Sequence, residues 1–208
     1  MEDILTMNKI DFKKELKNLY NPSAKTATVI DVPPLNFLMI DGHGDPNTAP
    51  AYREAVEALF SLSYALKFMV KKELAVDYAV MPLEGLWWAD DMSRFSVEDK
   101  SGWLWTAMIM QPEYIVADLV ETARAQVARK KNLPALPRLR LETFHEGRAA
   151  QITHIGPYAA EAPTIAQLHQ FIAAQGGQCA GKHHEIYLND PGRTAPEKLK
   201  TVIRQPFA

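Results

Sequence analysis

The sequence has almost no cysteine: Cys179 is the single thiol among 208 residues. One thiol cannot close an internal disulfide, and the chain contains no Cys-x-x-Cys pair of the kind that holds zinc. A chain of this length can bury roughly 70% of its unfolded surface, so it needs no such covalent or metal staple. The cysteine content therefore predicts a protein of a reducing compartment, namely the cytoplasm.

Long apolar runs and an excess of one charge are also missing. Lys, Glu or Asp interrupts each hydrophobic run well before the roughly 18 residues of a membrane span. The first twenty residues lack the basic and then apolar pattern of a signal peptide. The 23 basic residues nearly balance the 25 acidic ones, giving a net charge of −2, whereas nucleic-acid binders usually carry a basic excess. We therefore expect neither a membrane nor a nucleic acid as a partner.

Tryptophan is present in an unusual distribution. All four tryptophans lie in one short stretch, at Trp87, Trp88, Trp103 and Trp105. They could be core residues of one hairpin, or they could line an aromatic pocket for a ligand. Spacing alone favours the core, because clustered aromatic residues usually pack together.

The predicted elements occur twice in the same order, as two strands, a helix and two further strands. Similar turn-rich segments precede the two helices, and a Gln-Pro pair ends both halves, in AMIMQP and TVIRQP. The first half has predicted strands over 26–32, 37–41, 78–81, 86–88 and 103–110, and helices over 50–74 and 113–130. The second half has predicted strands over 139–145, 149–155, 183–188 and 199–204, and a helix over 163–175.

This repeat predicts an α+β fold in which helices cover one face of an antiparallel sheet. Residues 1–24 form a short leader, and 25–208 form one domain with halves of about 25–132 and 138–208. A groove between two such halves is a common place for a small ligand.

Four phrases of the sequence carry a family resemblance: FLMIDGHGDPN, PLEGLWW, THIGPY and HHEIYLNDP. Together they resemble the GyrI-like small-molecule-binding family, from about Phe37 to Pro206. That family includes the gyrase inhibitory protein and the effector domains of multidrug-responsive transcription activators. The phrase WLWTAMIMQPEY is most similar to the stand-alone members. The resemblance implies two pseudo-symmetric strand–helix–strand–strand modules and an aromatic cleft with an acidic residue at its base.

The acidic position of the family corresponds to Glu185. Some stand-alone members hydrolyse the cyclopropane of DNA-alkylating natural products, and others bind lipophilic cations or dyes. The transcriptional members carry a further DNA-binding domain. About two dozen residues precede the first predicted strand here, too few for a helix-turn-helix domain, so we do not expect a regulator that acts on its own.

Strand alternation places Glu185 and Tyr187 on one face of their strand, and His184, Ile186 and Leu188 on the other. We expect the second, more apolar set to face the helices and the first to face the groove. A carboxylate on an aromatic floor would have a raised pKa, or would stay ionised opposite a cationic ligand.

Further candidate residues surround this acid. We expect Tyr158, at the start of the second-half helix, to polarise a carbonyl group of the ligand and so to join Glu185 as a catalytic residue. Trp105 and Met108 lie on opposite faces of one strand, and only one of those faces can line the groove. Trp87 and Trp88 likewise point to opposite sides. The predicted ligand-binding residues are Phe37, Trp88, Trp105, Met108 and Tyr187.

Three functions remain open from the sequence. The first is a cofactor-independent hydrolase in which Glu185 deprotonates a water molecule that opens a cyclopropane. The second is a drug-binding, sequestering or sensing module without turnover, which would use the same residues. The third is an inhibitory protein–protein interaction of the gyrase type, although no segment identifies a protein partner. No metal is expected, because neighbouring His183 and His184 point apart on a strand.

Overall fold

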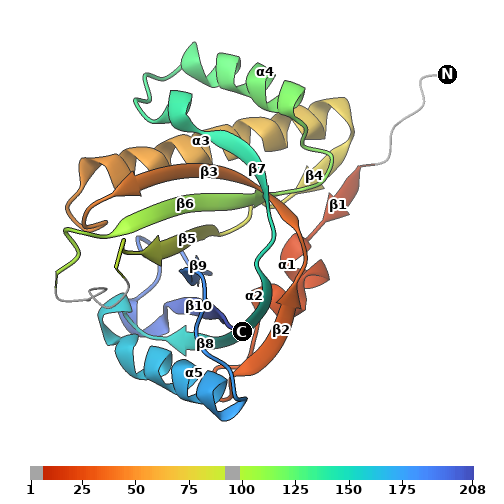
Figure 1. The fold of residues 1–208 in the computed structure, drawn as a ribbon. Helices are drawn as coiled ribbons and strands as arrows, with labels where there is room; N and C mark the ends of the chain where they lie inside the picture. The colour runs from red at the N-terminus through yellow and green to blue at the C-terminus, as the bar shows by residue number, and fades with distance from the viewer. Residues whose placement is uncertain (1–6, 92–98) are drawn as a thin grey trace.

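The computed structural model describes residues 7–91 and 99–208. Its main feature is an eight-stranded antiparallel sheet with the strand order β2-β8-β10-β9-β5-β6-β3-β7 (Figure 1). The strands are β2 (Thr28–Val32), β3 (Leu35–His43), β5 (Leu83–Trp88), β6 (Leu104–Gln111), β7 (Arg140–Phe144), β8 (Gly147–Ile155), β9 (His183–Tyr187) and β10 (Lys200–Pro206). The sequence expectation of an α+β fold with an antiparallel sheet is confirmed.

Three longer helices cover this sheet or pack on one another. Helix α3 lies against β3 and β6, α4 packs on α3, and α5 lies against β8 and β10. Their bounds are α3 (Pro50–Glu73), α4 (Ala117–Ala128) and α5 (Ala162–Ala174). Short 3₁₀ turns are η2 (Leu136–Arg138), η3 (Tyr158–Ala160) and η4 (Pro196–Lys198). No helix within residues 7–91 and 99–208 has both the length and the apolar character needed to cross a bilayer.

The two halves of the chain form matching modules that meet in the middle of the sheet. β3, α3, β5 and β6 make the first module, β8, α5, β9 and β10 make the second, and β5 pairs with β9 where they meet. Each module also lends a strand to the other. β2, which precedes β3, pairs with β8, and β7, which precedes β8, pairs with β3. The β5–β9 pairing joins the halves into one sheet, and the exchanged strands β2 and β7 form its two edges.

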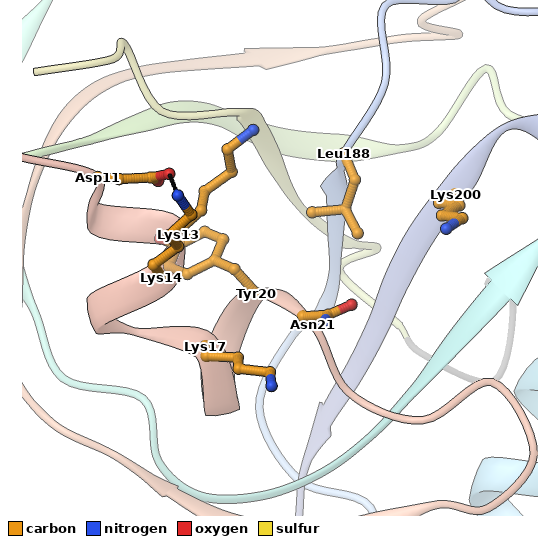
Figure 2. Close-up of a pocket in the computed structure, with 8 residues that line it drawn as sticks. All are labelled: Asp11, Lys13, Lys14, Lys17, Tyr20, Asn21, Leu188 and Lys200. Atoms are coloured by element: carbon orange, nitrogen blue, oxygen red, sulfur yellow. Dashed lines mark ion pairs between the residues drawn. The ribbon is translucent and has the colours of Figure 1, made fainter.

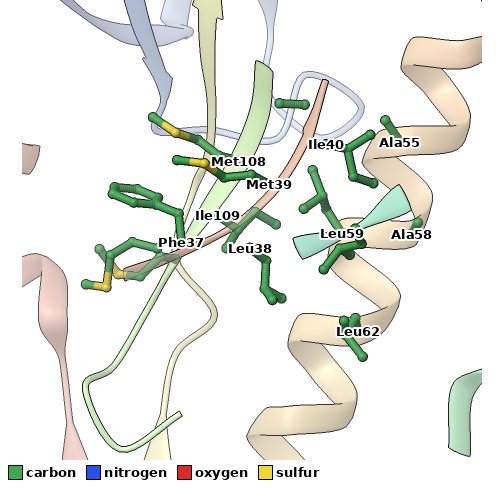
Figure 3. Packing of buried hydrophobic residues seen from close by; sticks show 14 of the residues in the cluster. Phe37, Leu38, Met39, Ile40, Ala55, Ala58, Leu59, Leu62, Met108 and Ile109 are labelled. Atoms are coloured by element: carbon green, nitrogen blue, oxygen red, sulfur yellow. The ribbon is translucent and has the colours of Figure 1, made fainter. Parts of the chain in front are cut away.

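Both α3 and α5 cover the same face of the sheet. Residues directly opposite each other on paired strands share a face, so Ile203 of β10 shares a face with Ile152 of β8 and Glu185 of β9. Ile203 and Ile152 pack with Leu168 of α5. Figure 3 shows the other module, where Leu38, Ile40 and Ile109 point toward Leu59 and its neighbours on α3. Helices on one face of the sheet are therefore confirmed.

The alternation along β9 runs opposite to the expected direction. Glu185 lies on the helix-bearing face, so His184 and Ile186 lie on the other face, and the expectation that this set faces the helices is wrong. The physical reason is that the second face is also covered. Leu19 and Tyr20 of the N-terminal segment are buried there, so an apolar strand face is needed on both sides.

The N-terminal segment is short and mostly helical. β1 (Asn8–Ile10) pairs in parallel with β4 (Val76–Tyr78), and α1 (Phe12–Glu15) and α2 (Lys17–Tyr20) follow. α1 and α2 border a hollow of about 400 Å³ with a basic rim (Figure 2). The residues around it are Asp11, Lys13, Lys14, Lys17, Tyr20, Asn21, Leu188 and Lys200.

A buried polar network fastens this segment to the sheet. The Tyr20 hydroxyl donates to Glu84 Oε1 at 2.7 Å. His184 donates from Nε2 to Glu84 Oε2 at 3.0 Å and from Nδ1 to Glu146 Oε1 at 3.0 Å. Arg204 donates to Glu146 Oε2 at 3.0 Å. All five side chains are buried, so each charge depends on these partners for its stabilisation.

Candidate functional site

Glu185 lies at the centre of the sheet, where the two modules meet. It stands opposite Ile203 on β10 and Gly85 on β5. On the shared helix-bearing face, it lies between the part of the sheet under α3 and the part under α5. Its side chain keeps 13% of its surface exposed, so the carboxyl group is nearly buried but still borders solvent.

The Glu185 carboxylate is held by two donors from its own strand. The Tyr187 hydroxyl donates to Oε2 at 2.7 Å, and His183 Nε2 donates to Oε1 at 3.1 Å. Burial alone would raise the pKa of Glu185, but the hydrogen bond and charge of His183, with Tyr187 next, hold this pKa below its usual range. Glu185 is therefore ionised at neutral pH.

A second buried glutamate is present beside it. Glu161 follows η3 at the residue before α5, and its exposed fraction is 4%. Its Oε1 accepts no hydrogen bond from the described residues. Burial, and next the negative charge of Glu185, raise the pKa of Glu161 to about 8. Glu161 therefore holds a proton at neutral pH.

Two carboxyl groups in opposite protonation states give this site both a base and an acid. Neighbouring carboxyl groups in a poorly solvated place do not both ionise, because like charges repel. Glu185 is the better hydrogen-bonded of the two, so it carries the negative charge and Glu161 keeps the proton. Glu185 can accept a proton or balance a cation, and Glu161 can donate a proton.

Tyrosines surround the acid pair. Tyr52 projects from the first turn of α3, and Tyr158, in η3, meets Tyr187 edge to face with ring centroids 5.4 Å apart. Burial first, and then the charge of Glu185, raise the pKa of Tyr52 and of Tyr187. These hydroxyl groups therefore stay protonated, and that of Tyr187 donates to Glu185.

Two buried tryptophans support Tyr52 from below. Its ring centroid is 5.0 Å from that of Trp105 and 5.5 Å from that of Trp87. Glycines allow both indoles to lie flat on the sheet. A Cβ atom at Gly42 would stand 2.2 Å from the Trp105 ring, and one at Gly85 would stand 2.7 Å from the Trp87 ring. Because Gly42 and Gly85 have no side chains, the two indole rings lie close to the sheet. This closeness sets the distance of Tyr52 from the sheet.

The structure brings some of the predicted site residues together and separates others. Glu185, Tyr158 and Tyr187 form one cluster. Trp105 lies on the same face but is completely buried under Tyr52, so it supports the cluster from below.

The other predicted ligand-binding residues lie on the opposite face of the sheet. Phe37 and Met108 point away from α3 (Figure 3), and the alternation that buries Trp87 beside Tyr52 turns Trp88 the other way. Lys182 Nζ stands 3.4 Å from the centre of the Trp88 ring, so this ring already has a cationic partner.

Four residues of the cluster were not predicted: Tyr52, Trp87, Glu161 and His183. Strand alternation alone places His183 on the face of Glu185, and this signal could have found it. For Glu161, the available signal was its place just before the second-half helix, in the segment that echoes the start of the first. Trp87 and Tyr52 come from elements distant in sequence, and only the fold brings them together.

Metal ligation is not supported by the arrangement of side chains. No group of three or more His, Cys, Asp and Glu side chains in the described ranges could hold a metal ion. Within the acid cluster, His183 is engaged with Glu185 and His184 points to the opposite face.

Comparison with known proteins identifies one family and several similar solved structures. The sequence profile of the GyrI-like small molecule binding domain matches residues 26–207. An uncharacterized conserved protein from Listeria innocua is 40% identical, with a TM-score of 0.89 over 96% of this chain and 100% of that one. A hydrolase from the same organism is also 40% identical, with a TM-score of 0.85 over 97% of this chain and 100% of that one.

A more distant structure shares the fold alone. The C-terminal domain of EcmrR is 11% identical, with a TM-score of 0.53 over 88% of this chain and 97% of that domain. No curated protein matches the chain at a significant level.

Proposed function

The chain belongs to the GyrI-like small-molecule-binding family, and on this premise we propose that it binds planar hydrophobic molecules and hydrolyses a strained, cyclopropane-bearing electrophile among them. The observation that supports this proposal is the pair of buried carboxyl groups, with Glu185 ionised and Glu161 protonated. A 40% identical relative from Listeria innocua is described as a hydrolase, which favours water as the second reactant.

The proposed reaction adds one water molecule across a strained carbon–carbon bond. Glu185 takes a proton from the water molecule while the water oxygen forms a bond to a cyclopropane carbon. The ring bond breaks, and its electron pair moves into the conjugated carbonyl group of the substrate. Glu161 gives its proton to that carbonyl oxygen. The proton that Glu185 took from water then passes to Glu161, which restores both carboxyl groups. The net reaction adds one water molecule to the substrate.

The surrounding hydroxyl groups orient the reactants. Tyr187 already donates to Glu185 Oε2, which leaves the remaining lone pairs of the carboxylate for water. Tyr158 is 40% exposed and stands at the border of the cluster, so we assign it a hydrogen bond to the substrate carbonyl. A general base and a general acid each contribute typically about 10²–10⁴-fold, which is substantial for a substrate that is already strained.

Product analysis tests this proposal directly. The purified protein is incubated with a cyclopropane-bearing DNA alkylator in ¹⁸O-labelled water, and mass spectrometry follows the ring-opened product. We expect wild type to form a product that carries one ¹⁸O atom, and Glu185→Gln to form little above buffer. If Glu185→Gln turns over as fast as wild type, the assignment of the base is wrong.

Binding without turnover is the second candidate, and the ionised state of Glu185 favours it specifically. A carboxylate bordered by tyrosine rings suits an aromatic cation, because each good ring face adds about 0.5–2 kcal/mol. Tryptophan fluorescence separates the two functions. Quenching that saturates with the ligand, while wild type yields no ring-opened product, would assign the site to sequestration or sensing.

A further inference from the structure

The outer side of α3 exposes a row of aromatic side chains that the site does not use. Phe60, Tyr64 and Phe68 follow one another at four-residue spacing, and consecutive rings stack with centroids 6.4 and 6.5 Å apart. Tyr64 is 48% exposed and Phe68 is 60% exposed. A contiguous exposed apolar patch on a folded protein commonly marks an interaction surface.

This row borders a groove of about 650 Å³ between α3 and the end of α4. We call its α3 wall the α3 stripe. The stripe consists of Glu57, Phe60, Ser61, Tyr64, Ala65, Phe68, Met69, Lys72 and Glu73. On the α4 side, Lys131 donates to Ser61 at 3.1 Å. The stripe begins at the acidic Glu57 and ends at Lys72 and Glu73, and the side chains between them are mostly apolar.

The order of residues in the stripe is self-complementary. If the same helix from a second copy lies antiparallel across it, with the twofold axis between Tyr64 and Ala65, large side chains meet small ones. Tyr64 then faces Ala65 of the second copy, and Phe68 faces Ser61 of the second copy. Phe60 faces Met69 of the second copy, which is only 8% exposed, so this pair adds little to the contact.

The charges follow the same symmetry. Glu57 would face Lys72 of the second copy, and Lys72 would face Glu57 of the second copy. Both side chains are exposed, and neither forms an ion pair with the described residues of its own chain. A twofold interface uses one patch on both subunits, so it requires this kind of self-complementarity in size and charge.

We propose that the α3 stripe is the contact surface of a symmetric homodimer, in which the α3 helices of two copies pack antiparallel. The acid pair at Glu185 lies at the centre of the sheet, on side chains separate from this stripe. The dimer therefore leaves the ligand site of each subunit accessible.

Sedimentation velocity of the full chain at increasing protein concentration tests the proposal. We expect a reversible dimer, and we expect Tyr64→Ser with Phe68→Ser to raise its dissociation constant by about tenfold or more. Val116→Ser, which alters an exposed apolar residue at the other end of α4, is the matched control and should leave the dimer unchanged. Circular dichroism checks that each variant is folded.

Charge reversal tests the antiparallel arrangement itself. Glu57→Lys and Lys72→Glu should each weaken the dimer, and the double variant should restore it, because each new charge again meets its opposite. Glu197→Lys makes the same charge change at a remote exposed position and should have no effect. A monomer at all concentrations would overturn the proposal. So would a dimer that none of these substitutions alters, or a monomer whose stripe instead binds an anilinonaphthalene sulfonate probe.

Discussion

Glu161 and Glu185 are the same kind of residue, but different surroundings put them in different protonation states. Both oxygens of Glu185 accept hydrogen bonds, whereas Oε1 of Glu161 has no donor among the described residues. Burial penalises a charge on either group. The negative charge therefore stays on Glu185, the carboxylate that receives hydrogen bonds. This charge makes the ionisation of Glu161 less favourable.

Replacing Glu161 by glutamine should separate catalysis from binding. Glu161→Gln keeps the shape of the side chain but removes its transferable proton. We expect ring opening to slow by about 10²–10⁴-fold, while ligand-dependent quenching of tryptophan fluorescence changes little. Glu197→Gln, an exposed residue in η4, serves as the control. An unchanged rate in Glu161→Gln would show that Glu161 is not the acid.

At the scale of the element, strands β3 and β5 support the site because each has a glycine, with no side chain, under a tryptophan ring. Gly42 and Gly85 give the indoles of Trp105 and Trp87 room to lie on the sheet, and Tyr52 of α3 rests on both rings. The position of Tyr52 relative to Glu185 thus depends on two glycines from different strands.

Gly42→Ala should therefore destabilise the protein and disturb the site together. The new methyl group overlaps the Trp105 ring, which must move, and overpacking of this kind typically costs about 1–3 kcal/mol. Urea unfolding measures the loss, and near-ultraviolet circular dichroism reports the tryptophan environment. In Gly102→Ala the added atom meets nothing within 4 Å, so this variant should behave as wild type. Equal stability of the two variants would contradict the packing account.

The N-terminal helices are a second element whose attachment can be tested. Tyr20→Phe removes the donor to Glu84 Oε1 and leaves a buried carboxyl oxygen without that partner. We expect a loss of about 1–3 kcal/mol in the free energy of unfolding. The matched control is Tyr114→Phe, because the Tyr114 hydroxyl has no hydrogen-bond partner in the described structure. The account is wrong if both substitutions have the same effect.

For the whole molecule, the buried network on the opposite face makes stability depend on pH. Burial would lower the pKa of His184, but the carboxylates, chiefly Glu146, raise it to about 9. Burial would likewise raise the pKa of Glu146, but His184 and Arg204 lower it to about 2. The unfolded values are about 6.5 for His and about 4.3 for Glu.

The signs of these shifts define the pH range of greatest stability. The contribution of His184 is complete below pH of about 6.5 and is lost as pH rises through about 9. The contribution of Glu146 is complete above pH of about 4.3 and is lost as pH falls toward about 2. We expect the difference in unfolding free energy between wild type and His184→Gln to shrink between pH 6.5 and 9. A constant difference across that pH range would show that His184 is not protonated in the folded protein.

The sequence predicts the local elements well because their signals are local. The helix expected over 50–74 is Pro50–Glu73, and the strand expected over 183–188 is His183–Tyr187. The sequence did not predict that β2 pairs with β8 and β7 with β3, because strand exchange between modules depends on contacts between distant residues.

The same distinction holds for the site. Glu185 follows from the family resemblance, and its neighbour Tyr187 follows from strand alternation. The expected set of aromatic residues was split because alternation tells which residues share a face, but not which face the helices cover. Glu161 carries no local mark of burial, since its surroundings are made by β9 and β10 from the end of the chain.

The central claim is that Glu161 and Glu185 share a buried site in opposite protonation states, and carboxyl titration by NMR tests it without knowledge of the substrate. With ¹³C-labelled glutamate, the Glu161 resonance should titrate near pH 8 in wild type and at lower pH in Glu185→Gln, where the neighbouring charge is absent. If the Glu161 resonance in wild type titrates near pH of about 4.3, as an ordinary glutamate does, the account of the site is contradicted.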